Sequence, residues 1–447
     1  MTVTVRDETI AGLPGGQDQE QEAARAYIRA NQRWNFGVNV LVSGFWQFAM
    51  SFIFGATVLA LYSSYLTDSA VLIGLIPAMQ SAMFFFPQLL LARKAQTLAR
   101  AKPFVVRLSL FERLPYGVIA LSIFLWPDAP RGLAYAILAL SLMMATGSGG
   151  LLNPAWKAMI AKVVPLRRRG LLFGMSNALG GLMGMGGAAI SRQVFLRYDY
   201  PYSFAIIFMF CCIAQLISWG LMSLNREPTL QPRAPALSNH EYWRRLPQLL
   251  RQDRNFWRFL VGRNLMLLGT MGMTFYIVYA RFAFNISDAY AANLTMAALL
   301  GQTVSTPLLG VFADRQGNKL LAELGSLFLV IALGLVLVVR HEFWLYLVFM
   351  LANMSMAAGM ISGINITMEF GPPEEMPTYS ALASTVNAVP ILMAPLVGGW
   401  LVDLFGYQLM FVVAVAFTLV GILYMHLLVH DPRADAERYA AAPQQPQ

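Results

Sequence analysis

Charged residues and cysteines are scarce in this chain. Only 12% of its 447 residues are Asp, Glu, Lys or Arg and 57% are hydrophobic, whereas a soluble domain carries about twice that charged share. The two cysteines, Cys211 and Cys212, are adjacent within an apolar run, so we expect small buried hydrophobic residues and no disulfide. No metal site and no cofactor are expected either, because the four histidines are scattered: His240, His341, His426 and His430.

Nucleotide-driven and enzymatic activities lack their usual sequence features. There is no G-x-x-x-x-G-K-[ST] phosphate-binding loop. Acids and histidines do not gather at one membrane face, as a lipid-modifying membrane enzyme would require, so we expect no enzyme and no catalytic residue. The formal charge of +9 is spread over particular loops, which favours membrane lipid over nucleic acid as a partner.

Long apolar stretches fill the chain instead. A helix needs about 20 apolar residues to cross the hydrocarbon core, and the lack of water there forces backbone groups to pair within the helix. We therefore predict an all-α integral membrane protein with twelve transmembrane helices in two pseudo-symmetric six-helix bundles. The predicted helices are 36–62, 70–92, 104–126, 132–153, 170–195, 202–224, 258–284, 288–312, 321–340, 343–366, 380–402 and 408–429.

A polar, Arg-rich stretch separates the sixth helix from the seventh and divides the chain. The predicted segments are a cytoplasmic N-terminal segment, a first bundle, a cytoplasmic linker, a second bundle and a cytoplasmic tail: 1–34, 35–224, 225–257, 258–430 and 431–447. The stretch from Gln17 to Trp34 is expected to form a short helix of its own. The two halves also share a weak repeat, since a shift of 210 positions places Asn177 on Asn387.

Lysine and arginine concentrate in the loops that follow the even-numbered helices. By the positive-inside rule, these loops and both termini lie in the cytoplasm, and the protein resides in the cell (inner) membrane. The loop after the tenth helix is acidic, but acids weigh little in this rule. The basic residues that carry the assignment are Arg93, Lys94, Arg100 and Lys102 after helix 2, Lys157, Lys162, Arg167, Arg168 and Arg169 after helix 4, and six arginines in the linker with Arg258 directly after it.

Two loop sequences carry a family resemblance. GVFADRQGNK (Gly310–Lys319) and GGWLVDLFGY (Gly398–Tyr407) resemble signatures of the major facilitator superfamily, and PLRRRG before the fifth helix is similar to that family too. The resemblance implies a secondary transporter that works by alternating access around a site near the bilayer midplane. It also implies a chain that encloses its own pathway, so we expect a monomer.

The same resemblance gives Asp314 and Arg315 a gating role. A carboxylate at the cytoplasmic end of one helix can cap the positive N-terminus of another, and helix 11 is expected to begin nearby, close to Thr378. The corresponding loop of the first half has no acid between Asp68 and Glu112, so it cannot form the same latch. The alternative is an ordinary solvated pair of loop residues.

Two ionisable residues stand out inside predicted helices. Glu112 lies eight to nine residues into helix 3 and is the candidate for proton coupling, with H+ as the coupling ion; the alternative is a structural ion pair. Adjacent residues diverge by about 100° on a helix, so we expect Arg113 not to be its main partner. Arg263 lies inside helix 7, and three interpretations stay open: pairing with a gate carboxylate, pairing with a substrate anion, or extension towards the interface.

Uncharged polar residues predict the substrate cavity. They lie on helices that line the cavity in the resembling family (1, 4, 7 and 10) and at the repeat-related asparagines, although amides in a bundle also simply bridge helices. Few charges among them would suit a neutral or weakly polar organic solute. The predicted cavity residues are Asn39, Ser43, Trp46, Gln47, Thr270, Thr274, Asn353, Asn177 and Asn387.

The sequence thus predicts a secondary active transporter that moves a small organic solute across the cytoplasmic membrane. Proton-coupled efflux is the expected mode, by analogy with common members of the family. The alternative is a transporter-like membrane protein without transport activity, such as a receptor, scaffold or assembly factor.

Overall fold

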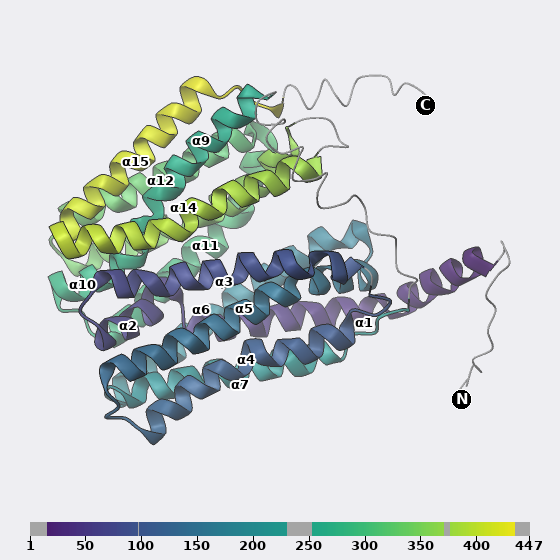
Figure 1. Cartoon of the computed structure of the whole chain (residues 1–447), viewed down its shortest axis with the longest axis horizontal. Helices are drawn as coiled ribbons and strands as arrows, with labels where there is room; N and C mark the ends of the chain where they lie inside the picture. The colour runs from purple at the N-terminus through teal and green to yellow at the C-terminus, as the bar shows by residue number, and fades with distance from the viewer. Residues whose placement is uncertain (1–15, 97, 230–252, 371–375, 434–447) are drawn as a thin grey trace.

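The computed structural model describes residues 16–96, 98–229, 253–370 and 376–433, which form helices and no strand. Twelve long helical segments run side by side in two groups (Figure 1). The first group is α1 (Gly16–Phe52) continued by α2 (Ala60–Leu66), α3 (Ala70–Gln96), α4 (Lys102–Leu125), α5 (Arg131–Val163), α6 (Leu166–Arg197) and α7 (Tyr202–Ser223). The second is α9 (Arg254–Leu268) continued by α10 (Tyr276–Phe284), α11 (Asp288–Gln316), α12 (Asn318–Val338), α13 (Leu345–Asn365), α14 (Met376–Phe405) and α15 (Tyr407–Leu428).

Eleven of these helical segments are long and apolar enough to cross a membrane. The twelfth long segment, α6, has the length but begins with three arginines and is rich in glycine, which lowers its mean hydropathy. It packs between α1 of its own half and α11 of the other half, so it lies among protein rather than apart from the bundle. The predicted all-α membrane architecture is confirmed.

The first helix is longer than the sequence predicts. The expected short helix at 17–34 and the expected crossing from residue 36 are one continuous helix, α1. The segment before Trp34 is rich in Glu, Gln, Ala and Arg and contains no proline, so nothing in its sequence ends the helix. Residues 1–15, most of the linker (230–252) and the tail from 434 lie outside the described residues.

Both leading helices of the two halves are interrupted. A π-helical turn, η1 (Gly55–Leu59), separates α1 from α2, and a 3₁₀ segment, η2 (Gly269–Phe275), separates α9 from α10. Short non-α turns inside a helix often mark functional hinges, and transporter sites are commonly built at such interrupted helices. The interruptions therefore point to the space between α1 and α9.

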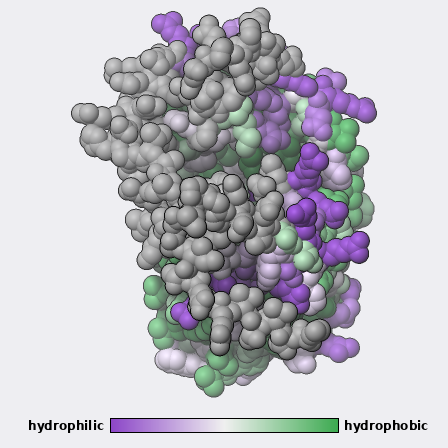
Figure 2. Space-filling model, turned by 90° about the vertical axis from the view of Figure 1, so that its right-hand side faces the viewer, coloured by the Kyte–Doolittle hydropathy of each residue, from purple (hydrophilic) through white to green (hydrophobic). Residues whose placement is uncertain are grey.

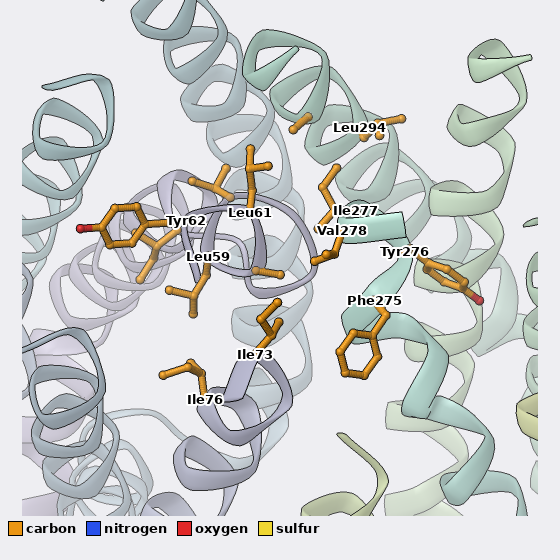
Figure 3. Packing of buried hydrophobic residues seen from close by; sticks show 14 of the residues in the cluster. Leu59, Leu61, Tyr62, Ile73, Ile76, Phe275, Tyr276, Ile277, Val278 and Leu294 are labelled. Atoms are coloured by element: carbon orange, nitrogen blue, oxygen red, sulfur yellow. The ribbon is translucent and has the colours of Figure 1, made fainter. Parts of the chain in front are cut away.

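The hydrophobic core is shared at one end of the molecule and divided at the other. The largest buried cluster joins residues of both halves, among them Leu61 and Ile73 with Phe275 and Leu294, whose side chains face one another in Figure 3. Three smaller clusters each belong to one half alone. We call the end with the shared cluster the closed end, and the opposite end, where α1 begins and α15 ends, the open end.

Hydrophilic residues are exposed at the open end (Figure 2). Figure 2 looks onto it and shows hydrophilic residues gathered along one side of the visible described surface. In Figure 1 it lies on the right, and the closed end with α2 and α10 lies on the left.

Candidate functional site

A cavity of about 810 Å³ lies between the two halves. Both helix interruptions line it, through Gly55 of η1 and Thr270 of η2. Leu59, Ile73 and Leu329 line it too and belong to the shared hydrophobic cluster, so that cluster forms the wall towards the closed end. The volume is in the range of sites for small organic ligands.

Six of the nine residues predicted for the cavity line it. Gln47 connects two of the helices around it, because its Nε2 donates to the carbonyl oxygen of Ser176 at 3.2 Å and to Oδ1 of Asn177 at 3.5 Å. The amide of Asn353 is buried and donates to Phe349 O at 3.0 Å. The six lining residues are Trp46, Gln47, Asn177, Thr270, Thr274 and Asn353.

The other three predicted residues are not among the lining residues. Asn39 is buried against the end of α7, and its Nδ2 donates to Oδ1 of Asn225 at 2.6 Å. Asn387 accepts a hydrogen bond from Nδ2 of Asn264 at 3.2 Å, which links α14 to α9. Ser43 is half-buried on α1 and has no side-chain hydrogen bond among the described residues. Asn39 and Asn387 thus bridge helices, which is the alternative role of a buried amide.

Residues of α3 and α11 also line the cavity and were not predicted. Gln80 lies on α3 and Gln302 on α11, and Ser326 of α12 joins them. The described lining includes no residue of α5, the fourth predicted helix, although the resemblance places that helix at the cavity. The available signal was a glutamine in the middle of each of two apolar stretches, which is costly in lipid unless the side chain faces the interior.

Arg263 is the one ionisable residue among the described cavity-lining residues. Its Nη2 donates to the carbonyl oxygen of Gly359 on α13 at 2.9 Å. Its Nε is buried and has no hydrogen-bond partner among the described residues. The side chain therefore points across the bundle to α13 and not towards the interface.

Glu112 lies behind the cavity wall. Trp46, which lines the cavity, donates its indole Nε1–H to Oε1 of Glu112 at 3.4 Å. The other carboxylate oxygen pairs with Nη1 of Arg113 at 2.9 Å, and Arg113 also donates to the backbone carbonyls of Ser109 and Gln215. The expectation that Arg113 is not the main partner was wrong. The helical angle separates the Cβ directions, but a guanidinium on a long flexible stem can curl back to its neighbour.

A polar contact of three hydrogen bonds joins the halves at the closed end. Asp403, in the GGWLVDLFGY motif at the end of α14, accepts hydrogen bonds from the backbone N–H groups of Ala70 (2.7 Å) and Val71 (3.1 Å) and from Ser69 Oγ (2.8 Å). These donors form the N-terminus of α3 in the other half. The carboxylate satisfies N–H groups that lack an intrahelical partner and lies at the positive end of the helix dipole.

A second contact between the halves lies nearby. The hydroxyl of Tyr65 donates to Asp288 at the start of α11 at 2.9 Å, and the guanidinium of Arg281 lies 3.7 Å above the Tyr65 ring. Arg281 is 3.8 Å from the Asp288 carboxylate. One tyrosine of the first half thus contacts a cation and an anion of the second. Deeper in the interface, the hydroxyls of Thr57 and Thr295 share a hydrogen bond.

Asp314 and Arg315 lie at the open end, at the end of α11. Both side chains are exposed, and neither has a hydrogen bond or ion pair with another described residue. The residues just before α14, 371–375, lie outside the described part of the chain. The sequence predicts that Asp314 caps helix 11 of its own half; the cap that joins the two halves is made in this structure by Asp403 at the opposite end.

The neighbouring part of the Gly310–Lys319 motif is anchored to the loop after α13. Nδ2 of Asn318 donates to Oε1 of Glu369 at 2.6 Å. Burial raises the pKa of Glu369, while the hydrogen bond from Asn318 acts in the opposite direction. In the first half, a carboxylate from after α7 contacts the start of α4: Glu227 accepts from the backbone N–H groups of Ala101 and Lys102 at 2.9 and 2.7 Å. This contact joins residues more than 120 positions apart.

Comparison with known proteins identifies the architecture. A sequence profile of the Major Facilitator Superfamily matches residues 265–447. No curated protein matches the chain by sequence. Among solved structures, a variant of the nucleoside transporter NupG is similar with a TM-score of 0.67 at 12% identity, over 88% of this chain and 99% of that one.

Two further solved structures are similar over nearly the whole chain. One is a D-xylose–proton symporter, with a TM-score of 0.65 at 16% identity, covering 89% of this chain and 98% of that one. The other is a bacterial homologue of the human lysosomal transporter Spinster in an inward-facing, occupied conformation, with a TM-score of 0.62 at 15% identity and coverage of 92% and 97%. At these identities the likeness establishes the fold, and the predicted arrangement of two six-helix bundles is confirmed.

Proposed function

We propose that the chain is a secondary transporter of the major facilitator superfamily, whose profile matches residues 265–447, and that it carries a small organic solute through the central cavity by alternating access. The observation that carries the proposal is the contrast between the two ends. The halves share a hydrophobic cluster and several hydrogen bonds at the closed end, whereas each half keeps its own clusters at the open end. When the two bundles rock about the central site, the closed end opens and the open end closes.

We propose that the open end faces the cytoplasm of the cell (inner) membrane. The basic loops after α3 and α5 lie at this end, which the positive-inside rule supports. The segments 1–34, 225–257 and 431–447 would then be cytoplasmic, and 35–224 and 258–430 would be the two moving bundles. Because the pathway lies within one chain, a monomer in contact with membrane lipid is the proposed working unit.

Proton-driven efflux is the proposed mode. In the conformation described here a cytoplasmic solute has access to the cavity. Glu112 is the proposed proton carrier, because its carboxylate is linked through one hydrogen bond to Trp46 in the cavity wall. A change of charge at Glu112 would alter both that hydrogen bond and the ion pair with Arg113. Protonation of Glu112 would thereby change the position of Trp46, which lines the solute cavity.

Transport into proteoliposomes tests the proposal. The protein would be placed in inverted orientation and offered radiolabelled candidate solutes under an imposed pH gradient. We expect the solute to accumulate inside the proteoliposomes, and the accumulation to collapse when a protonophore removes the gradient. If no solute class accumulates, and spin labels at the open end report no solute-dependent distance change, the alternative is favoured: a membrane protein of this fold acting as a receptor, scaffold or assembly factor.

For the Glu112→Gln variant we expect pH-driven accumulation to fall by about 10-fold while solute exchange without a gradient continues, since the amide keeps the shape but cannot carry a proton. The double variant Glu112→Gln/Arg113→Gln is the control, because it also removes the buried charge that the single change leaves unpaired. Accumulation equal to wild type in Glu112→Gln would eliminate this residue as the proton carrier.

A further inference from the structure

We infer that the solute is an amphiphilic organic anion whose charged group binds Arg263. The inference rests on the proposed function, because it assigns a substrate class to the same central cavity. It replaces the expectation of a neutral solute, which assumed that the cavity carries almost no charge.

The first support is the lack of a counter-charge. Arg263 lies about nine residues inside α9, roughly 14 Å from the start of that helix. No carboxylate of a described residue pairs with it, and its protein acceptor in the described chain is one carbonyl, Gly359 O. Its Nε is buried without a partner. A cation at this depth is unfavourable unless an anion or several acceptors compensate it, and such residues commonly mark transport pathways.

The second support is the space that two glycines of α13 leave beside the guanidinium of Arg263. Gly359 and Gly363 lie one turn apart on α13 and face it. A Cβ at Gly363 would lie 3.0 Å from Nη2 of Arg263, and one at Gly359 would lie 3.5 Å from it. A methyl group at Gly363 would therefore crowd the guanidinium, whereas one at Gly359 would make an ordinary contact with it. The backbone of α13 therefore holds the cation at the cavity instead of allowing it to extend to the interface.

The rest of the cavity defines the other part of the solute. Apart from Arg263, the described lining is made of apolar side chains with a few amides and hydroxyls, including Met50, Met273 and Phe54. A single fixed cation in such surroundings suits a carboxylate or similar anionic group on an apolar body. Guanidinium and carboxylate form two parallel hydrogen bonds, which would give the unpartnered N–H groups their acceptors.

Three naphthyl compounds that differ in charge provide the test. Equilibrium dialysis at pH 7.5 would measure binding of 2-naphthoate, 2-naphthamide and 2-naphthylmethylammonium to the protein in lipid nanodiscs, with empty nanodiscs subtracted. We expect naphthoate to bind about 10-fold more tightly than the other two, and Arg263→Gln to abolish this preference. Arg263→Lys should retain part of it, and Gly363→Ala should weaken naphthoate binding alone.

Arg340→Gln is the matched control, because it removes one positive charge from an exposed loop and should leave all three affinities unchanged. Equal binding of the three compounds to the wild-type protein would overturn the inference, and so would a naphthoate preference that survives in Arg263→Gln. Binding in nanodiscs requires no transport. A negative result therefore leaves the proposed alternating access standing, and the distance measurements at the two ends test that separately.

Discussion

Replacing Asp403 by asparagine is expected to open the closed end. The side chain keeps its size, but the charge at the N-terminus of α3 is lost along with the strength of three hydrogen bonds from Ser69, Ala70 and Val71. A cap of this kind contributes about 1–2 kcal/mol. The ratio of open to closed populations at this end should therefore rise roughly 5- to 30-fold.

Spin labels on the two halves would measure this change. After replacement of the buried Cys211 and Cys212 by alanine, cysteines at Asp68 and Ala283 place one exposed label on each half at the closed end. Asp403→Asn should add a population at longer distance in pulsed dipolar spectra. Asp314→Asn is the matched control, because that carboxylate is exposed at the opposite end without a partner among the described residues. Equal distance distributions in the two variants would show that Asp403 does not hold the closed end shut.

The helices could be predicted from sequence because membrane crossing imposes a strong local rule. Each crossing needs its own apolar stretch, so α12 and α15 are evident from composition alone. The least apolar of the predicted helices, α6, is still predictable because the part after its three arginines contains no charged residue until Arg192. Helix ends were predicted less well. α5 extends ten residues beyond the predicted end at 153, because the helix continues through Pro154 to Val163.

Polar cavity residues were partly predictable for the same physical reason. An amide or a cation in an apolar helix is costly unless it faces protein or a cavity, so the sequence pointed to Gln47 and Asn353, and both line the cavity. For Arg263 the sequence left extension towards the interface open, whereas the structure places it at the cavity. Whether such a residue meets the cavity or another helix depends on tertiary packing. The packing places Asn353 at the cavity, whereas it places Asn39 against Asn225 of another segment.

The hydrogen bonds of Asp403 that hold the closed end together could not be predicted, because they join residues more than 330 positions apart. The motif around Asp403 was recognised as a helix end, but its acceptor role requires that the end of α14 meet the start of α3. The resemblance instead directed attention to Asp314, as a cap for helix 11 of its own half. A carboxylate can cap a helix of the other half only at an end where the halves are in contact, and Asp403 does so at the closed end.

Gly74→Ala is expected to prevent full closure of that same end. Gly74 of α3 faces the backbone of α14, and a Cβ there would collide with the carbonyl oxygen of Pro395. The contact is reciprocal, because a Cβ at Gly399 of α14 would lie 2.5 Å from Ala70 O. Overpacking costs about 1–3 kcal/mol, so the open population at this end should rise roughly 5- to 150-fold, again read from labels at 68 and 283.

The reciprocal glycines distinguish a shift between conformations from a loss of folding. Gly334→Ala on α12 gains the same helix propensity but meets nothing within 4 Å, so its distances should match those of the parent protein. Once Gly74→Ala has separated α3 from α14, adding Gly399→Ala should change little, because the second collision exists only in the closed state. Additive destabilisation of the double variant, with unchanged distances, would instead show that the two glycines serve only the packing of each bundle.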